Sequence, residues 1–197
     1  MQIENNKEEV PFSYYAEVFA KADTAEITAR LGIPFADGAF KLTLLGQEYT
    51  VAHPAATVAP ACPLPVQTFL LRYLLEAKTV AWCGDWKTFR EMPWGELYIK
   101  PYTGRVLTRA AFTFGTRVEK FRTACEKLGA TPLKHGDAGF EFDFIGGYKI
   151  QILVWGPDEE FPPNAQVLYS DNFAQGFAAE DRVVAGDILI THIKAAM

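Results

Sequence analysis

Cysteine is scarce in this chain of 197 residues, which contains only Cys62, Cys83 and Cys125. None of them forms a C-x-x-C pair, and an odd number is a poor basis for a disulfide framework. The N-terminal stretch "MQIENNKEEV" also lacks the basic and apolar regions of a secretory signal. We therefore expect reduced thiols in a cytoplasmic protein.

Long hydrophobic runs are missing as well. The longest stretch without a charge, residues 49–71, contains four prolines and His53, which argues against a membrane helix. We expect it to be a connecting loop that leads into a buried helix. Hydrophobic residues make up 49% of the chain and charged residues 22%, a globular composition that favours one folded domain over residues 1–197.

The net charge is only −5, but the charges are unevenly spread. Residues 100–127 hold seven basic and two acidic side chains, whereas residues 137–187 hold ten acidic and two basic ones. Two interpretations stay open: the segments neutralise each other in the fold, or the basic segment forms a face for an anionic small molecule. Because the chain is acidic and its basic residues form no dense run, we do not expect nucleic-acid binding.

The familiar catalytic and metal-binding motifs are absent from the sequence. It has no H-E-x-x-H, no G-x-S-x-G elbow, no P-loop and no glycine-rich turn from a strand to a helix. His53, His135 and His192 stand alone, so we expect each to be structural or exposed rather than a metal ligand. The sequence therefore predicts neither a metal nor a cofactor.

Helical patterns occupy both halves of the chain. A first helix is expected from near Ser13, with a break or restart at Asp23 and an end at Gly32. Apolar residues at i, i+3 and i+4 predict a second, largely buried helix over about residues 65–77. These helices flank the proline-rich loop.

Two more helices are expected in the second half. Thr116 and Glu119 have the spacing of a capping box, which predicts a helix over about residues 117–128. The carboxylates at residues 180–181 suit the N-terminus of a last helix.

Two segments have the alternation of β-hairpins. In "FKLTLLGQEYTV" a two-residue turn at Gly46 and Gln47 would pair Leu44 with Tyr49. A short strand is also expected at "QVLYSD". Because hairpins pair antiparallel, we predict an α+β fold: an antiparallel or mixed sheet built from two hairpins, with helices packed against it.

The second hairpin is "FEFDFIGGYKIQILVW". A three-residue loop over 145–147 would pair Phe144 with Tyr148 and set Asp143 opposite Lys149, which keeps the apolar side chains on one face. This loop predicts a type I turn whose last glycine is left-handed.

The segment "GDWKTFREMPWG", residues 84–95, is the first candidate site. Arg90 and Glu91 would orient a polar ligand while Trp86 and Trp94 cover it, as in pockets with apolar walls and a few polar groups. In the alternative, the aromatic side chains only anchor a loop and Arg90 forms an internal ion pair.

The second candidate is the acidic loop "WGPDEEFPPNA", where Asp158, Glu159 and Glu160 follow an apolar strand. Clustered oxygens suit hard cations, but consecutive side chains diverge and the ladder of a calcium loop is missing, so a solvated loop is favoured. We expect Arg90 to contact a carboxylate of this loop.

Several of these segments resemble an uncharacterised bacterial and archaeal family, domain of unknown function 3786. The similar pieces include "LGQEYTV" (45–51), "FLLRYLL" (69–75), "WKTFREMPWG" (86–95), "LGA" (128–130), "GDAGFEF" (136–142), "DEEFPPNAQVLYSD" (158–171) and "AED" (179–181). The resemblance implies no established activity. Some relatives carry a cysteine-rich iron–sulfur segment, which implies a link to redox or one-carbon metabolism. This chain lacks such a cluster, so that role would require a protein partner with an iron–sulfur centre.

Three functional hypotheses follow. The first is a cytoplasmic small-ligand-binding or accessory module whose site combines residues 84–95 with the acidic loop. The second is an enzyme that uses two of Asp158, Glu159, Glu160 and Asp171 as acid, base or metal ligands. The third is a structural or interaction protein without a small ligand.

Overall fold

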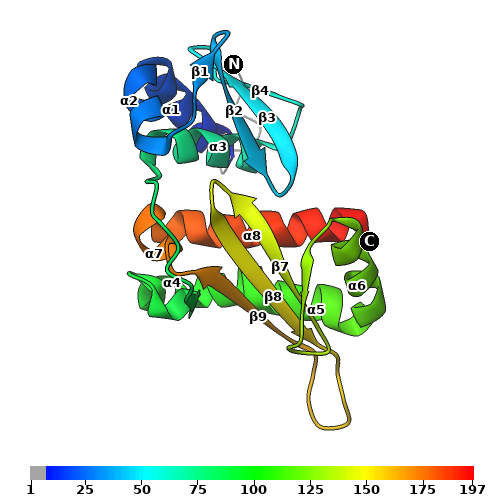
Figure 1. Ribbon diagram of the computed structural model, residues 1–197. Helices are drawn as coiled ribbons and strands as arrows, with labels where there is room; N and C mark the ends of the chain where they lie inside the picture. Colours follow the sequence, from blue (N-terminus) through cyan, green and yellow to red (C-terminus); the bar gives the residue numbers. More distant parts are fainter. Residues whose placement is uncertain (1–7) are drawn as a thin grey trace. The chain divides into compact units, whose positions relative to one another are not determined.

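The computed structural model describes residues 8–197 (Figure 1). The contacts divide the chain into two compact units, Met1–Val80 and Ala81–Met197, and each is described by itself. A single domain over the whole chain stays a prediction. Residues 1–7, which carry most of the stretch that lacks a secretory signal, lie outside the described residues.

The first unit combines three helices with a small antiparallel sheet. Asp23 starts its second helix by accepting a hydrogen bond from Ala25 N at 2.8 Å, and Gly32 ends that helix with φ +69°. The predicted restart at Asp23 is thus confirmed. The predicted helix over about 65–77 is confirmed as well, because the helix over Leu64–Glu76 buries Phe69, Leu70 and Leu74. The elements are α1 (Glu9–Ala20), α2 (Thr24–Leu31), β1 (Phe35–Ala36), β2 (Ala39–Leu44), β3 (Gln47–Ala52), β4 (Thr57–Ala59) and α3 (Leu64–Glu76).

The first hairpin has the predicted faces but a different register. Leu44 pairs with Gln47, so the predicted partner Tyr49 is wrong by two residues. The turn consists of Leu45 and Gly46, both with positive φ, as a type I′ turn requires. A shift of two residues leaves every side chain on its original face, and the apolar face is buried at Phe40, Leu42 and Val51.

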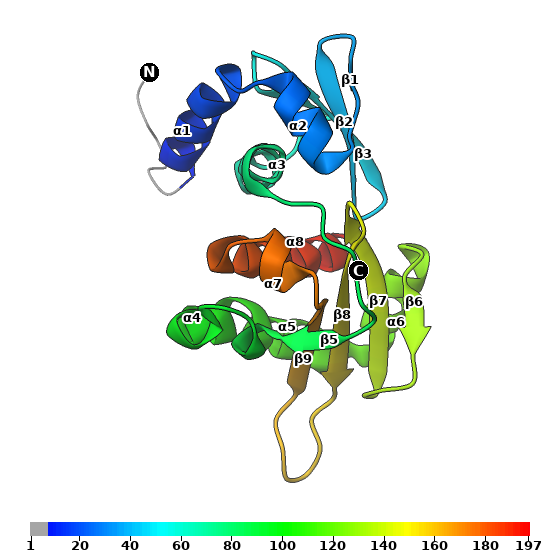
Figure 2. The same ribbon diagram turned by 60° about the vertical axis from the view of Figure 1, so that its left-hand side comes forward.

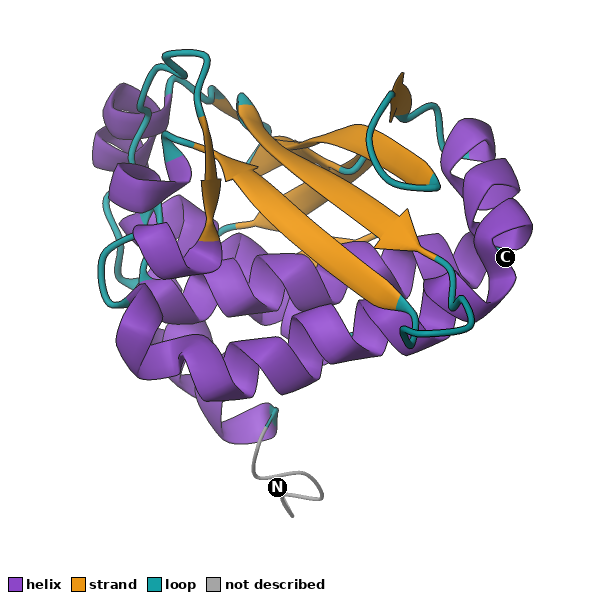
Figure 3. Cartoon of the chain, turned by 90° about the horizontal axis from the view of Figure 1, so that it is seen from below, coloured by secondary structure: helices purple, strands orange, loops and turns teal. Residues whose placement is uncertain are grey.

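The second unit is a five-stranded sheet with helices on one face (Figures 1 and 2). Its strands pair antiparallel in the order β6-β7-β8-β9-β5, which together with the helices confirms the α+β class (Figure 3). The strands are β5 (Trp86–Thr88), β6 (Thr131–Leu133), β7 (Ala138–Ile145), β8 (Tyr148–Trp155) and β9 (Asn164–Ser170). The helices are α4 (Gly95–Tyr102), α5 (Arg109–Phe114), α6 (Val118–Lys127), α7 (Phe173–Gly176) and α8 (Ala179–Ala196).

The helices cover the apolar face of this sheet. Helix α5 contacts β8 and β9, and α6 contacts β7. The Tyr169 hydroxyl crosses to α8, where it donates to the Arg182 carbonyl at 3.0 Å. The core between these layers is built from alternate strand residues, among them Phe140, Phe142, Ile150, Ile152 and Val167.

The second hairpin follows most of the predicted register. Asp143 pairs with Lys149 as predicted, and the loop's last glycine, Gly147, has φ +85°. Phe144, however, lies in a bulge, and Ile145 pairs with Tyr148. The predicted Phe144–Tyr148 pair is therefore wrong, because the extra residue is absorbed in the strand and the turn keeps two residues.

The helices between residues 95 and 114 were not predicted, and one predicted cap is wrong. Pro101 lies inside α4, and a wide π turn, Thr103–Thr108, connects α4 to α5. The Thr116 hydroxyl donates to the Phe112 carbonyl at 3.1 Å, so it does not cap α6 in the way predicted. Helix α8 begins at Ala179, directly before the acidic residues 180–181, as predicted.

Candidate functional site

Residues 84–95 form the edge of the second unit's sheet and the approach to α4. Strand β5 pairs with the end of β9, with Trp86 opposite Ser170. A 3₁₀ turn, Phe89–Glu91, follows and carries a complete capping box. Glu91 Oε2 accepts hydrogen bonds from both Thr88 N and Thr88 Oγ1 at 2.7 Å. These bonds lower the pKa of Glu91, so its carboxylate serves the turn itself.

Arg90 is paired within its own segment. Its Nε lies 2.8 Å from Glu96 Oε1, and both side chains are exposed. The hydrogen bond to Glu96 raises the pKa of Arg90 and lowers that of Glu96. The predicted contact between Arg90 and residues 158–160 is therefore wrong.

The acidic loop, which we define as residues 157–163, closes on itself. Asp158 Oδ1 accepts from Glu160 N at 2.8 Å and from Phe161 N at 2.7 Å. Asp158 N in turn donates to the Phe161 carbonyl at 3.0 Å. The Asp158 carboxylate thus stabilises a turn, while Glu159 and Glu160 face solvent.

The two candidate segments adjoin different parts of β9. The acidic loop enters this strand at Asn164, whereas β5 pairs near Ser170. The seven residues of β9 span about 20 Å and separate Asp158, which precedes the strand, from Asp171, which follows it. Figures 1 and 2 both show the loop projecting away from α4. Asp171 lies at the β5 end, where its Oδ1 accepts from Cys83 N at 3.2 Å, so it does not join Asp158 in one site.

A buried arginine from α8 anchors the segment before α4. Arg182 is 1% exposed, and its Nη2 donates to the Pro93 carbonyl at 2.7 Å. Its guanidinium lies 5.9 Å from the centre of the Phe89 ring, which stacks on Tyr102 at 4.0 Å. Burial lowers the pKa of Arg182 and raises that of Tyr102. The chain just before Trp94 is thus fixed from the core side.

Gly95 completes this anchor because it admits a close backbone approach. A Cβ atom at Gly95 would lie 2.1 Å from the Phe89 carbonyl oxygen. Trp94, the preceding residue, has φ +64°, a left-handed conformation that a bulky residue adopts only when its surroundings enforce it. The segment therefore holds Trp94 in a strained and fixed position.

A cluster of large apolar side chains lies at the start of α4, next to this anchor, and we call it the α4 face. Trp94 is 69% exposed, Leu97 72% and Tyr98 44%. Residues three and four positions apart on a helix are neighbours, so these side chains form one patch. Leu97 and Tyr98 were not singled out in the sequence, because the helix that brings them beside Trp94 was not predicted.

Trp86 has a packing role on the open face of the sheet. Its ring meets that of Trp82 at 5.4 Å in an edge-on contact. Lys149 Nζ lies 5.5 Å from the Trp82 ring, 2.9 Å from Glu141 Oε1 and 3.0 Å from Asp143 Oδ1. The carboxylates raise the pKa of Lys149. This cluster is satisfied internally, and a ligand-binding role for Trp86 stays a prediction.

The basic and acidic segments partly neutralise each other. Asp187 on α8 pairs with Arg109 Nη1 and lies 3.0 Å from Arg105 Nη2. Arg109 Nη2 also donates to Thr191 Oγ1 at 2.9 Å. For Arg105 and Arg109, these contacts confirm the interpretation that the basic and acidic segments neutralise each other in the fold.

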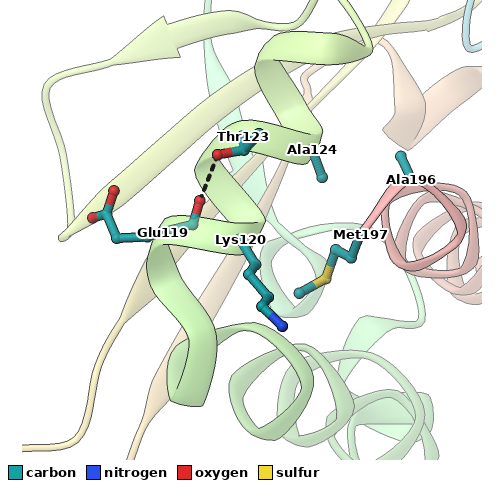
Figure 4. Close-up of a pocket in the computed structure, with 6 residues that line it drawn as sticks. All are labelled: Glu119, Lys120, Thr123, Ala124, Ala196 and Met197. Atoms are coloured by element: carbon teal, nitrogen blue, oxygen red, sulfur yellow. Dashed lines mark hydrogen bonds between the residues drawn. The ribbon is translucent and has the colours of Figure 1, made fainter.

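Neither of two shallow grooves includes the predicted site residues. One, of about 250 Å³, lies between α6 and the end of α8 and is lined by Glu119, Lys120, Thr123, Ala124, Ala196 and Met197 (Figure 4). The other, of about 450 Å³, lies beside α2 in the first unit. Across residues 8–197, no three His, Cys, Asp or Glu side chains are grouped so that they could hold a metal ion.

Comparisons with known proteins give a family and no activity. In the described part of the chain, no helix has the length and hydrophobicity needed to cross a membrane. No curated protein and no solved structure matches the chain. A family model described as "Domain of unknown function (DUF3786)" matches residues 23–192, and the chain therefore belongs to that family.

Proposed function

We propose that the chain is an accessory module that binds a protein partner through the α4 face. The observation that carries this proposal is the exposure of Trp94 and Leu97 side by side on an anchored backbone. Exposed apolar clusters of this kind mark interaction surfaces more often than isolated apolar residues do. Trp and Tyr are also the residues most enriched at the energetic centres of protein interfaces.

The anchor supports the proposal through preorganisation. Arg182 and Gly95 fix the backbone on both sides of Trp94 before any partner arrives. A side chain that is already positioned loses less conformational freedom on binding, so more of its contact energy appears as affinity. The exposed Arg90–Glu96 pair lies next to the patch and supplies the polar rim that interfaces commonly have.

A reducing cellular compartment belongs to the same proposal. The three cysteines are free, and Cys83 is exposed, which fits a reducing compartment such as the cytoplasm. A separate partner with an iron–sulfur centre, as the family resemblance implies, would give the module its link to redox or one-carbon metabolism, and no surface of the chain is assigned to it. Binding of an anionic small molecule stays a prediction.

Site-specific photo-crosslinking tests the proposal. A benzophenone amino acid would replace Leu97 on the α4 face or, as a matched control, the exposed Phe112 on α5. We expect a protein adduct from position 97 that is lost when Trp94→Ser is added, and none from position 112. Equal adducts at both positions, or none at position 97, would overturn the proposal.

A further inference from the structure

We infer that the partner of the α4 face is a second copy of this chain, which places its acidic loop against Trp94, Leu97 and Tyr98. This inference rests on the proposed function and names the occupant of that face. Two different surfaces meet in such a contact, so copies would join head to tail.

The acidic loop presents an exposed apolar side chain on an ordered turn. Phe161 is 65% exposed at its tip, and the two backbone bonds to Asp158 Oδ1 hold the turn that carries it. The base of the loop packs tightly, since a Cβ at Gly115 would lie 2.6 Å from Pro163 Cβ. An aromatic side chain on an ordered loop suits a patch of Trp and Tyr rings.

One cation beside the α4 face suits the acidic loop. The loop carries Asp158, Glu159 and Glu160 and no basic residue. At the α4 face, Arg90 is neutralised by its partner Glu96, and the exposed Lys100, one helical turn beyond Leu97, is the cation that can meet the carboxylates of the loop. Opposite charges around an apolar contact favour encounter and orientation.

The two surfaces of one copy do not reach each other. Within the second unit, Figures 1 and 2 both show the acidic loop projecting away from α4. Each copy therefore keeps one free loop and one free face after the first contact. A seven-residue loop buries less surface than a stable dimer requires, so the contact is expected to be weak and sensitive to salt.

Mixing two complementary variants tests the inference. Phe161→Ser removes the loop's apolar tip, and Leu97→Glu disables the face; both positions are exposed, and circular dichroism would verify that each variant folds. In sedimentation velocity at high protein concentration and low salt, wild type should associate beyond dimers, and each variant alone should stay monomeric. A one-to-one mixture should form dimers and stop there, because only one productive contact exists. Phe112→Ser should associate like wild type.

The outcomes separate this inference from the proposed function. A monomeric wild type, unchanged association of Phe161→Ser, or a mixture without dimers would overturn the second copy as occupant. In the crosslinking experiment at position 97, an adduct of twice the chain's mass supports the inference. An adduct with another protein alone refutes it and leaves the proposed function standing, whereas no adduct refutes both.

Discussion

Arg182 and Pro93 are separated by 89 positions in the sequence, and the Arg182 Nη2 nevertheless donates to the Pro93 carbonyl at 2.7 Å. This bond ties the first turns of α8 to the residue just before Trp94. A guanidinium is well suited to this task because it stays charged and offers several donors in a rigid fork. The Arg182–Pro93 bond therefore fixes the backbone that carries the α4 face.

Replacing Arg182 with Met should loosen the backbone next to the α4 face. Met fills similar volume but cannot donate to the Pro93 carbonyl, and a lost hydrogen bond from a charged group is worth about 1.5–3 kcal/mol. Removing a buried charge offsets part of that loss, so the global effect should be smaller than the local one. We expect amide hydrogen exchange over residues 89–96 to accelerate by more than it does in the core of β8. Uniform acceleration, or none, would contradict the anchoring role.

Gly95→Ala should destabilise the second unit strongly. The new Cβ would lie 2.1 Å from the Phe89 carbonyl oxygen, so the backbone must move, at a cost of about 3 kcal/mol or more. Gly104→Ala is the matched control, because nothing lies within 4 Å of its Cβ and the residue is helical. It should be neutral or stabilising by up to about 1 kcal/mol. Urea unfolding would measure the free energy of unfolding of both variants. Similar losses for the two variants would refute the close approach at Gly95.

Acidification should destabilise the chain through His192. Burial lowers the pKa of His192 below its ordinary value of 6.5, so the unfolded state binds a proton more readily than the folded state. The free energy of unfolding should therefore fall as the pH drops below about 6.5. His192→Gln should remove that part of the pH dependence. The measurement is the free energy of unfolding of wild type and of His192→Gln between pH 7 and pH 5. An unchanged slope against pH in the variant would exclude His192 as the cause.

Asp187→Asn should cost more stability than Asp143→Asn. Asp187 lies between Arg105 and Arg109, whereas the Asp143 side chain is 87% exposed and contacts Lys149. We expect a loss of about 0.5–1 kcal/mol for Asp187→Asn and less than about 0.5 kcal/mol for Asp143→Asn. High salt should narrow the difference, since it screens exposed charges. Equal losses would show that the bridged arrangement adds nothing.

Local signals predicted most of the fold correctly. Asp23 and Gly32 mark the ends of α2 because a cap and a left-handed glycine act within one turn of the chain. The pairing of Asp143 with Lys149 followed from the parity of alternating side chains. Such signals depend on nearest neighbours, so the sequence contains them in full.

Beyond the local errors in turn register and capping, the sequence analysis fails where distant residues decide. Residues 95–114 contain Pro101 and Gly104, which hide a helix whose burial comes from contacts with β9 and α8. Arg90 had an acidic neighbour in sequence, Glu96, but only the helix start shows that the two side chains meet. Arg182 follows two acidic residues and gives no sign of its role, because its acceptor is a backbone carbonyl far away in the chain.

The π turn at Thr103–Thr108 sets the angular relation between the α4 face and the pair of arginines that holds Asp187. A π turn holds one residue more than an α-helical turn, and one residue corresponds to about 100° of rotation. Because the wider turn absorbs its extra residue without that rotation, Trp94 keeps its orientation relative to Arg109. An extra residue in an ordinary α-helical turn would rotate Trp94 about the helix axis, so the π turn preserves the direction in which the patch points.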